Sequence, residues 1–79
     1  MILDSNTSSE LLFMITQLPL SLKKKIPIEF QMEIINKYSK EVYNSFIPDK
    51  PFYEQNISDE ALTIFCDLMS QYVTYENFD

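Results

Sequence analysis

The chain has no histidine, glycine, arginine or tryptophan, and only one cysteine among its 79 residues. Without histidine, no side chain titrates near neutral pH at its ordinary pKa. Without glycine, the chain lacks the loops that cradle phosphate groups in the known nucleotide-binding motifs. Arginine is the usual bidentate donor to phosphate and carboxylate groups, so its absence counts against a site of that kind. These absences indicate a binding protein rather than an enzyme.

The single cysteine, Cys66, excludes a disulfide within the chain, and no histidine or second cysteine accompanies it at metal-ligand spacing. This cysteine usage fits a reducing compartment. The N-terminal sequence lacks a basic region followed by an apolar stretch, and no run of about 18 apolar residues occurs anywhere. We therefore predict a soluble, cytoplasmic protein without a membrane segment, a metal or a cofactor.

Twelve carboxylates outnumber six lysines, which gives a net charge of −6. Nucleic acid and anionic membranes attract proteins with an excess of Lys and Arg, so we expect neither as a direct partner. The lysine run at 23–25 would release few counterions, and we interpret it as a solvated connector. The charge favours a basic protein as the partner. The alternative is that the carboxylates only keep the protein soluble.

The length of the chain allows one domain, because a chain of this size buries only about 60% of the surface that it exposes when unfolded. Hydrophobic residues make up 46% of the sequence and aromatic residues 14%, which is too apolar for a disordered chain. We expect one helical domain over residues 1–79, with flexible ends at about 1–6 and 76–79. A small domain this apolar is expected to leave an apolar patch for a partner or a second copy.

The first helix is predicted to open at Thr7, because Thr7 and Glu10 have the spacing of a capping box. Pro19 bars its continuation. On a helical wheel Phe13 points away from the main apolar stripe, and we expect it to be buried against a neighbouring segment. The residues of that stripe are Leu11, Leu12, Met14, Ile15 and Leu18.

Residues 20–25 are expected to form a short helical connector, after which Pro27 occupies a favoured first position of a second helix that ends near Lys40. Gln31 lies inside the apolar arc of this helix, so its amide should bond to the backbone. The opposite side carries polar residues, among them Glu29 and Glu33. The apolar arc consists of Ile28, Met32 and Ile35, widened by Phe30, Ile34 and Tyr38.

Residues 41–47 are compatible with a helix end or a short extended segment. The following Pro48-Asp49-Lys50-Pro51 predicts a loop, which Phe52-Tyr53 would attach to the domain. Ser58 is a good N-cap for a last helix that runs to about Tyr75. The width of its apolar arc predicts that this helix is central. The main stripe of the last helix is Ala61, Ile64, Phe65, Leu68 and Tyr72.

Together these patterns predict an all-α fold, a small bundle of three main helices with a short helical connector and a Pro-containing loop before the last helix. Pairs of carboxylates, such as Glu29 with Glu33 or Asp59 with Glu60, would need a cleft that separates their pKa values before they could act as acid and base. The wheel places Glu29 and Glu33 on a solvent face. We therefore predict no catalytic residues.

A binding surface for another protein is the site that the sequence supports. Six carboxylates on the second helix, the loop and the start of the last helix are expected to form an acidic surface that speeds the capture of a basic partner. Three aromatic residues nearby would act as apolar anchors, because interface affinity concentrates in such groups. The predicted protein-binding residues are Glu29, Glu33, Tyr43, Asp49, Phe52, Tyr53, Glu54, Asp59 and Glu60.

Short segments between Leu18 and Tyr72 also carry a resemblance. They are Lys25-Ile26-Pro27 with Phe30, Pro48-Asp49-Lys50-Pro51, and Glu54-Gln55-Asn56-Ile57-Ser58 followed by Glu60-Ala61-Leu62. With these segments the chain resembles a group of small uncharacterised helical proteins from low-GC Gram-positive bacteria. The resemblance implies a helical domain and brings no established activity.

The function predicted from these observations is that of an acidic, non-catalytic protein-binding module. Its most plausible form is a stoichiometric inhibitor or immunity-type factor that covers a basic site, such as that of a nuclease or nucleic-acid-handling complex. The alternative is a structural or regulatory subunit that forms homo- or hetero-oligomers through exposed apolar surface along the last helix and near Phe52. Salt should weaken the first kind of association and leave the second intact.

Overall fold

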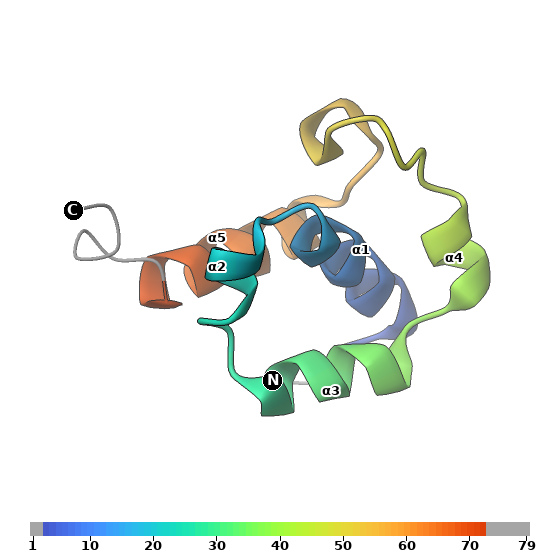
Figure 1. The fold of residues 1–79 in the computed structure, drawn as a ribbon. Coiled ribbons are helices and arrows are strands. Elements are labelled where there is room, and N and C mark those ends of the chain that lie inside the picture. Colours follow the sequence, from blue (N-terminus) through green and yellow to red (C-terminus); the bar gives the residue numbers. More distant parts are fainter. Residues whose placement is uncertain (1–2, 73–79) are drawn as a thin grey trace.

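The protein was studied as a computed structural model, which describes residues 3–72 (Figure 1). This part of the chain contains no strand. The all-α class, the three main helices, the short connector and the Pro-containing loop before the last helix are confirmed. The elements are α1 (Ser5–Thr16), α2 (Leu20–Lys23), α3 (Ile28–Lys37), α4 (Lys40–Asn44), the short 3-10 helix η1 (Phe52–Glu54) and α5 (Asp59–Tyr72).

Helix α1 begins three residues earlier than predicted, with its N-cap at residue 4 instead of residue 7. Its N-cap is Asp4, whose Oδ1 accepts a hydrogen bond of 2.7 Å from the Thr7 backbone N–H. Leu3 is buried in the core at 5% exposure. Residues 3–6, which we predicted as part of a flexible end, are therefore held by a cap and by burial. The other residues of the predicted flexible ends, 1–2 and 76–79, lie outside the described residues.

Helix α1 is the central helix, which corrects the prediction that α5 holds this place. It packs against α3, α4 and α5, and in Figure 1 it lies between α4 and α5 with α3 below it. Its apolar side chains are buried on more than one side of the helix. Phe13, outside the main stripe, is buried in a stack with Phe46 at 4.7 Å between ring centroids. The expected burial of Phe13 is confirmed. The other buried apolar side chains of α1 are Leu11, Met14 and Ile15.

A pair of serines ends α3 earlier than predicted. The Ser39 backbone N–H donates to the Ser9 Oγ of α1 at 2.8 Å, and the Ser9 hydroxyl donates to the Ser39 carbonyl at 3.2 Å. Tyr38 is extended, with ψ of 154°, so the helix cannot continue through it. The Ser39 Oγ then caps α4 by accepting from the Val42 N–H. A tertiary contact thus divides the predicted helix and makes a separate short helix of residues 40–44.

Helix α3 is rotated relative to the predicted orientation. Ile34 is fully buried, whereas Ile28, Met32 and Ile35 are 63%, 49% and 47% exposed. The predicted stripe therefore faces outward. Gln31 explains this rotation, because its Nε2 donates to the carbonyls of Lys23 and Ile26 at 3.1 and 3.0 Å and so orients α3 against the connector. The backbone hydrogen bonding predicted for Gln31 is confirmed.

Helix α5 follows the prediction closely at its start. The Ser58 Oγ accepts from the Ala61 N–H at 3.2 Å, which confirms the N-cap. Ala61, Phe65 and Leu68 are buried, and the Phe65 ring lies 5.5 Å from that of Phe52. The helix is described to Tyr72, and its predicted end near Tyr75 lies outside the described residues.

Candidate functional site

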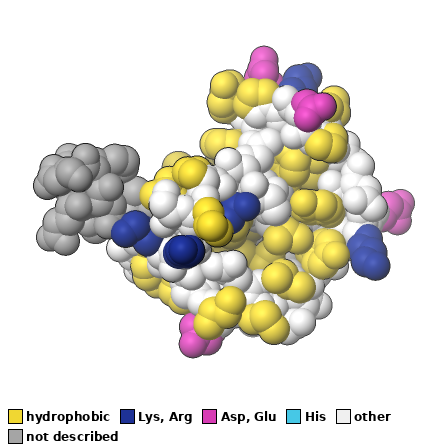
Figure 2. Space-filling view, viewed as in Figure 1, with side chains coloured by type: hydrophobic (Ala, Val, Ile, Leu, Met, Phe, Trp, Pro, Cys, Tyr) yellow, Lys and Arg dark blue, Asp and Glu magenta, His cyan; other side chains and the backbone are white. Residues whose placement is uncertain are grey.

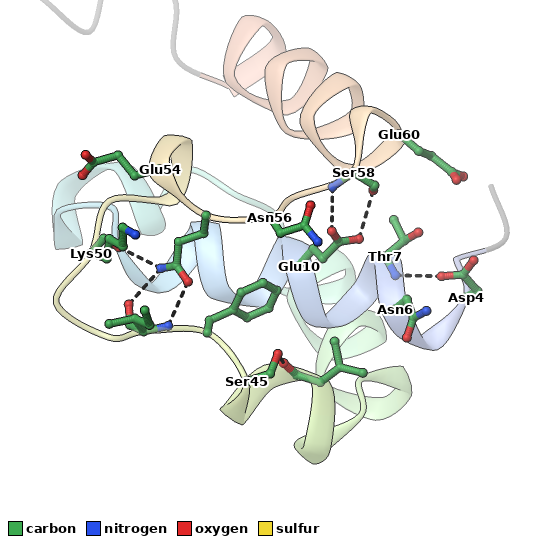
Figure 3. A pocket seen from close by; sticks show the side chains of 14 residues that line it. Asp4, Asn6, Thr7, Glu10, Ser45, Lys50, Glu54, Asn56, Ser58 and Glu60 are labelled. Atoms are coloured by element: carbon green, nitrogen blue, oxygen red, sulfur yellow. Dashed lines mark hydrogen bonds between the residues drawn. The ribbon is translucent and has the colours of Figure 1, made fainter.

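A polar cleft of about 700 Å³ opens on the surface of the described residues (Figure 3). Its walls come from the N-terminal turn of α1, the end of α4, the loop before α5 and the first turn of α5. The α1 segment is more than 30 residues away in sequence from the other three, which follow one another over residues 42–60, so the cleft exists only in the folded chain. It is called the acidic cleft below, because four carboxylates and one lysine line it: Asp4, Glu10, Glu54, Glu60 and Lys50.

Two of these carboxylates hold helix ends. The hydrogen bond from the Thr7 backbone N–H, together with one from the Thr7 side chain, lowers the pKa of Asp4 below its ordinary value. Glu10 is only 8% exposed, and its two oxygens accept from the Ser58 backbone N–H at 2.7 Å and from the Ser58 Oγ at 3.0 Å (Figure 3). Glu10 therefore joins the middle of α1 to the start of α5. This explains why the predicted capping box does not form.

The other two carboxylates of the acidic cleft, Glu54 and Glu60, are exposed. Figure 3 shows them at its two ends, with Glu54 on the side of η1 and Glu60 beyond Ser58. Because both side chains are exposed, their carboxylates are not needed for packing of the core. A bound cationic group would therefore meet negative charge at both ends of the cleft.

One wall of the acidic cleft is apolar. It is formed by Val42, Phe46 and Ile47, at the end of α4 and in the turn that follows. Phe46 is buried through its stack on Phe13, which fixes this wall to α1. Ile47 is 54% exposed. The cleft therefore offers an apolar contact next to its carboxylates, a combination that suits the long aliphatic stem and charged head of a basic side chain.

Two glutamine side chains hold the loop that borders the cleft. Gln55 accepts from the Ile47 N–H at 2.8 Å and donates to the carbonyls of Ile47 and Lys50 at 2.8 and 2.9 Å (Figure 3). From the other side, Gln17 of α1 donates to the Lys50 carbonyl at 3.0 Å and accepts from the Phe52 N–H at 3.0 Å. The loop is thus bonded to itself and to α1. Sequence reasoning missed this, because glutamine has no characteristic spacing for such contacts.

The structure does not gather the six predicted carboxylates into one surface. Glu54 and Glu60 share the acidic cleft, whereas Glu33 borders a smaller hollow of about 360 Å³ between α3 and α5. Figure 2 shows carboxylates at the top, at the right edge and at the lower left of one face. Glu33 also pairs with Lys37 at 3.4 Å. The remaining predicted carboxylates are exposed and line neither hollow: Glu29, Asp49 and Asp59.

The three predicted aromatic anchors differ in their surroundings. Phe52 is half-buried and packs on the core beside Phe65, so its main contacts are internal. Tyr43 is also half-buried, with ring contacts to Phe13 and Tyr38 at 6.4 and 5.8 Å. Tyr53 is 76% exposed. Of these three residues, Tyr53 alone has most of its surface exposed to solvent, and it lies next to Glu54 in the sequence.

Three of the exposed large apolar residues lie on α3, where we predicted none, and none lies on the described part of α5, where we predicted them; Tyr53, beside Phe52, is exposed. We call Ile28, Met32 and Ile35 the α3 stripe, since their spacing places them on one face of the helix. Leu20 of α2 is 66% exposed as well. Figure 2 shows hydrophobic side chains gathered over the face that α2 and α3 present, with lysine side chains close to α2. This surface was missed because the stripe was expected to be buried.

Searches against protein-family models, curated proteins and solved structures returned no match to this chain. The resemblance to small helical proteins of low-GC Gram-positive bacteria therefore stays a prediction. Within residues 3–72, no group of three or more cysteine and carboxylate side chains is arranged to hold a metal ion. No helix in the same range is long and apolar enough to cross a membrane.

Proposed function

We propose that the protein is a non-catalytic protein-binding module whose acidic cleft receives a basic segment of another protein. In this proposal it acts as a stoichiometric inhibitor or immunity-type factor that covers a basic site. The observation that supports it is the meeting of Glu54, Glu60 and the exposed Ile47 in one cleft. Carboxylates placed around an apolar wall match the chemistry of lysine and arginine side chains.

The two kinds of contact have different tasks. Charge complementarity raises the rate of association and orients the partner, since the attraction acts before contact. The apolar wall, with Tyr53 close to Glu54 in sequence, supplies the desolvated contacts in which interface affinity concentrates. The glutamine bonds of the loop place Ile47 before a partner arrives, which lowers the entropy that binding would cost.

The proposal is tested by charge reversal on two surfaces. Glu54→Lys with Glu60→Lys changes the acidic cleft, and Glu29→Lys with Glu33→Lys applies the same change in net charge to α3. Each protein is immobilised and exposed to lysate of the source organism, and the retained proteins are identified at low and high salt. We expect the unchanged chain and the α3 variant to retain a basic protein at low salt, and the cleft variant to lose it.

Circular dichroism of each variant confirms that it is folded. Loss of the basic protein from the α3 variant alone would move the site to Glu29 and Glu33. Retention by all three proteins would show that neither set of carboxylates is the binding site. Absence of any basic protein that salt removes would overturn the proposal as a whole.

A further inference from the structure

The charges of this chain are divided between two regions. Residues 23–40 contain five of the six lysines and two of the twelve carboxylates, an excess of three positive charges. The rest of the chain contains one lysine and ten carboxylates, an excess of nine negative charges. The α3 stripe lies in the positive region, and every carboxylate of the acidic cleft lies in the negative region. The overall charge therefore hides two regions of the sequence whose net charges are opposite in sign.

Each of these surfaces also has an apolar part. The α3 stripe has exposures between 47% and 63%, and three lysines at positions 23–25 come shortly before it in the chain. The acidic cleft has its wall of Val42, Phe46 and Ile47. One surface is an apolar helix face bordered by lysines, and the other is an apolar hollow bordered by carboxylates. Each therefore offers apolar contact, and the charges at their borders are opposite in sign.

We infer that the α3 stripe of one copy of the protein docks into the acidic cleft of a second copy. Ile28 and Met32 would lie against the apolar wall, and the lysines of residues 23–25 would face Glu54 and Glu60. No residue of α3 lines the cleft, so the two surfaces are distinct on each copy. The contact is therefore heterologous, and a docked pair still offers one free stripe and one free cleft to further copies.

The net charge of −6 on each copy opposes association at long range. At physiological ionic strength charges are screened beyond about 8 Å, so this repulsion fades while close pairs at the contact persist. The experiment is accordingly made at physiological salt. Self-association uses the same cleft as the proposed function. It does not depend on a basic partner, because the α3 stripe and the acidic cleft are both present on this chain.

Two blocked variants test the inference. Met32→Glu blocks the α3 stripe, and Glu54→Lys with Glu60→Lys blocks the acidic cleft. By analytical ultracentrifugation over a range of concentrations, we expect the unchanged chain to form dimers and larger species and each variant to stay monomeric. An equal mixture of the two variants should form a heterodimer and nothing larger, because one copy supplies an intact cleft and the other an intact stripe.

A matched control, Ser70→Glu, places the same new charge on an exposed position of α5 and should associate like the unchanged chain. Circular dichroism verifies the fold of every variant. A monomeric unchanged chain at high concentration would overturn the inference, and so would a mixture that stays monomeric, since that result indicates a symmetric contact. Capture of a basic protein by a chain that is always monomeric would reject self-association and leave the proposed function standing.

Discussion

Helices α3 and α5 have similar amphipathic patterns, yet they meet the central helix in different ways. α5 turns its predicted stripe inward, and Ala61, Phe65 and Leu68 are buried. α3 turns its predicted stripe outward, and Ile34 is its one buried residue. An apolar arc much wider than the contact allows more than one rotation of a helix about its axis. The pattern alone therefore predicts that a helix packs, but not which part of its arc packs.

The difference arises at the ends of the two helices. α5 is oriented by the Glu10 carboxylate, which bonds the Ser58 N–H and hydroxyl. α3 is oriented by the Gln31 amide, which bonds two carbonyls of the preceding connector. Because a buried polar group must keep its partners, each of these contacts selects one rotation. For α3 the selected rotation leaves an apolar stripe at the surface, and the inferred self-association depends on that stripe.

The largest effect is expected from Phe65→Ala in α5. Phe65 packs in the core beside Phe52, and replacing a buried phenylalanine by alanine costs about 3–5 kcal/mol in free energy of unfolding. The neighbouring Cys66 is exposed, so Cys66→Ala should change stability by less than about 0.5 kcal/mol. Urea denaturation followed by circular dichroism measures both. Equal effects at the two positions would show that α5 does not pack through this face.

A second pair of variants examines α3 in the same way. Ile34→Ala removes a fully buried side chain and should cost about 2–5 kcal/mol, whereas Ile35→Ala, at a residue 47% exposed, should cost less than about 1 kcal/mol. Both variants replace isoleucine by alanine inside the same helix, so the change in helix propensity is the same for the two. Thermal and urea unfolding give the comparison. If Ile35→Ala were the costlier change, α3 would be rotated as the sequence pattern first suggested.

Glu10→Gln tests the contact that orients α5. The substitution keeps the size of the side chain but replaces one acceptor oxygen by a donor that faces Ser58, so we expect a loss of about 1–3 kcal/mol in free energy of unfolding. Glu60→Gln, at an exposed position of the same cleft, serves as the control and should lie within about 0.5 kcal/mol of the unchanged chain. A negligible effect of Glu10→Gln would assign the orientation of α5 to apolar packing alone.

The smallest effect on stability is expected at Asp4, which caps α1. Helices α3 and α5 both pack on α1. Because its pKa is lower in the folded chain than in the unfolded chain, the charged carboxylate stabilises the fold above its ordinary pKa. This contribution is lost as the pH falls through the folded value. The difference in melting temperature between the unchanged chain and Asp4→Ala should therefore be largest near neutral pH and shrink in strong acid. A difference that does not change with pH would contradict a charged cap.

Several features of the fold could be predicted because they depend on neighbouring residues. The Ser58 cap, the connector after Pro19 and the loop at residues 48–51 all follow from local turn and cap chemistry. The role of Gln31 was predictable in kind, since a polar residue inside an apolar arc needs a partner. Of the predicted site residues, Glu54 and Glu60 do share a cleft, but no spacing in the sequence brings them next to Asp4 and Glu10.

By itself, then, the sequence determined the helical class and the positions of most helices, because helix propensity and capping act locally. Its composition also determined the acidic net charge and excluded the sites that need histidine or glycine. Only the tertiary structure decided that α1 is central, that Ser9 divides the second predicted helix at Ser39, and that the α3 stripe faces outward. The division at Ser39 depends on hydrogen bonds between residues 30 positions apart, and the rotation of α3 depends on the bonds from Gln31 to the connector. Such contacts form only when the whole chain has folded, and no local pattern encodes them.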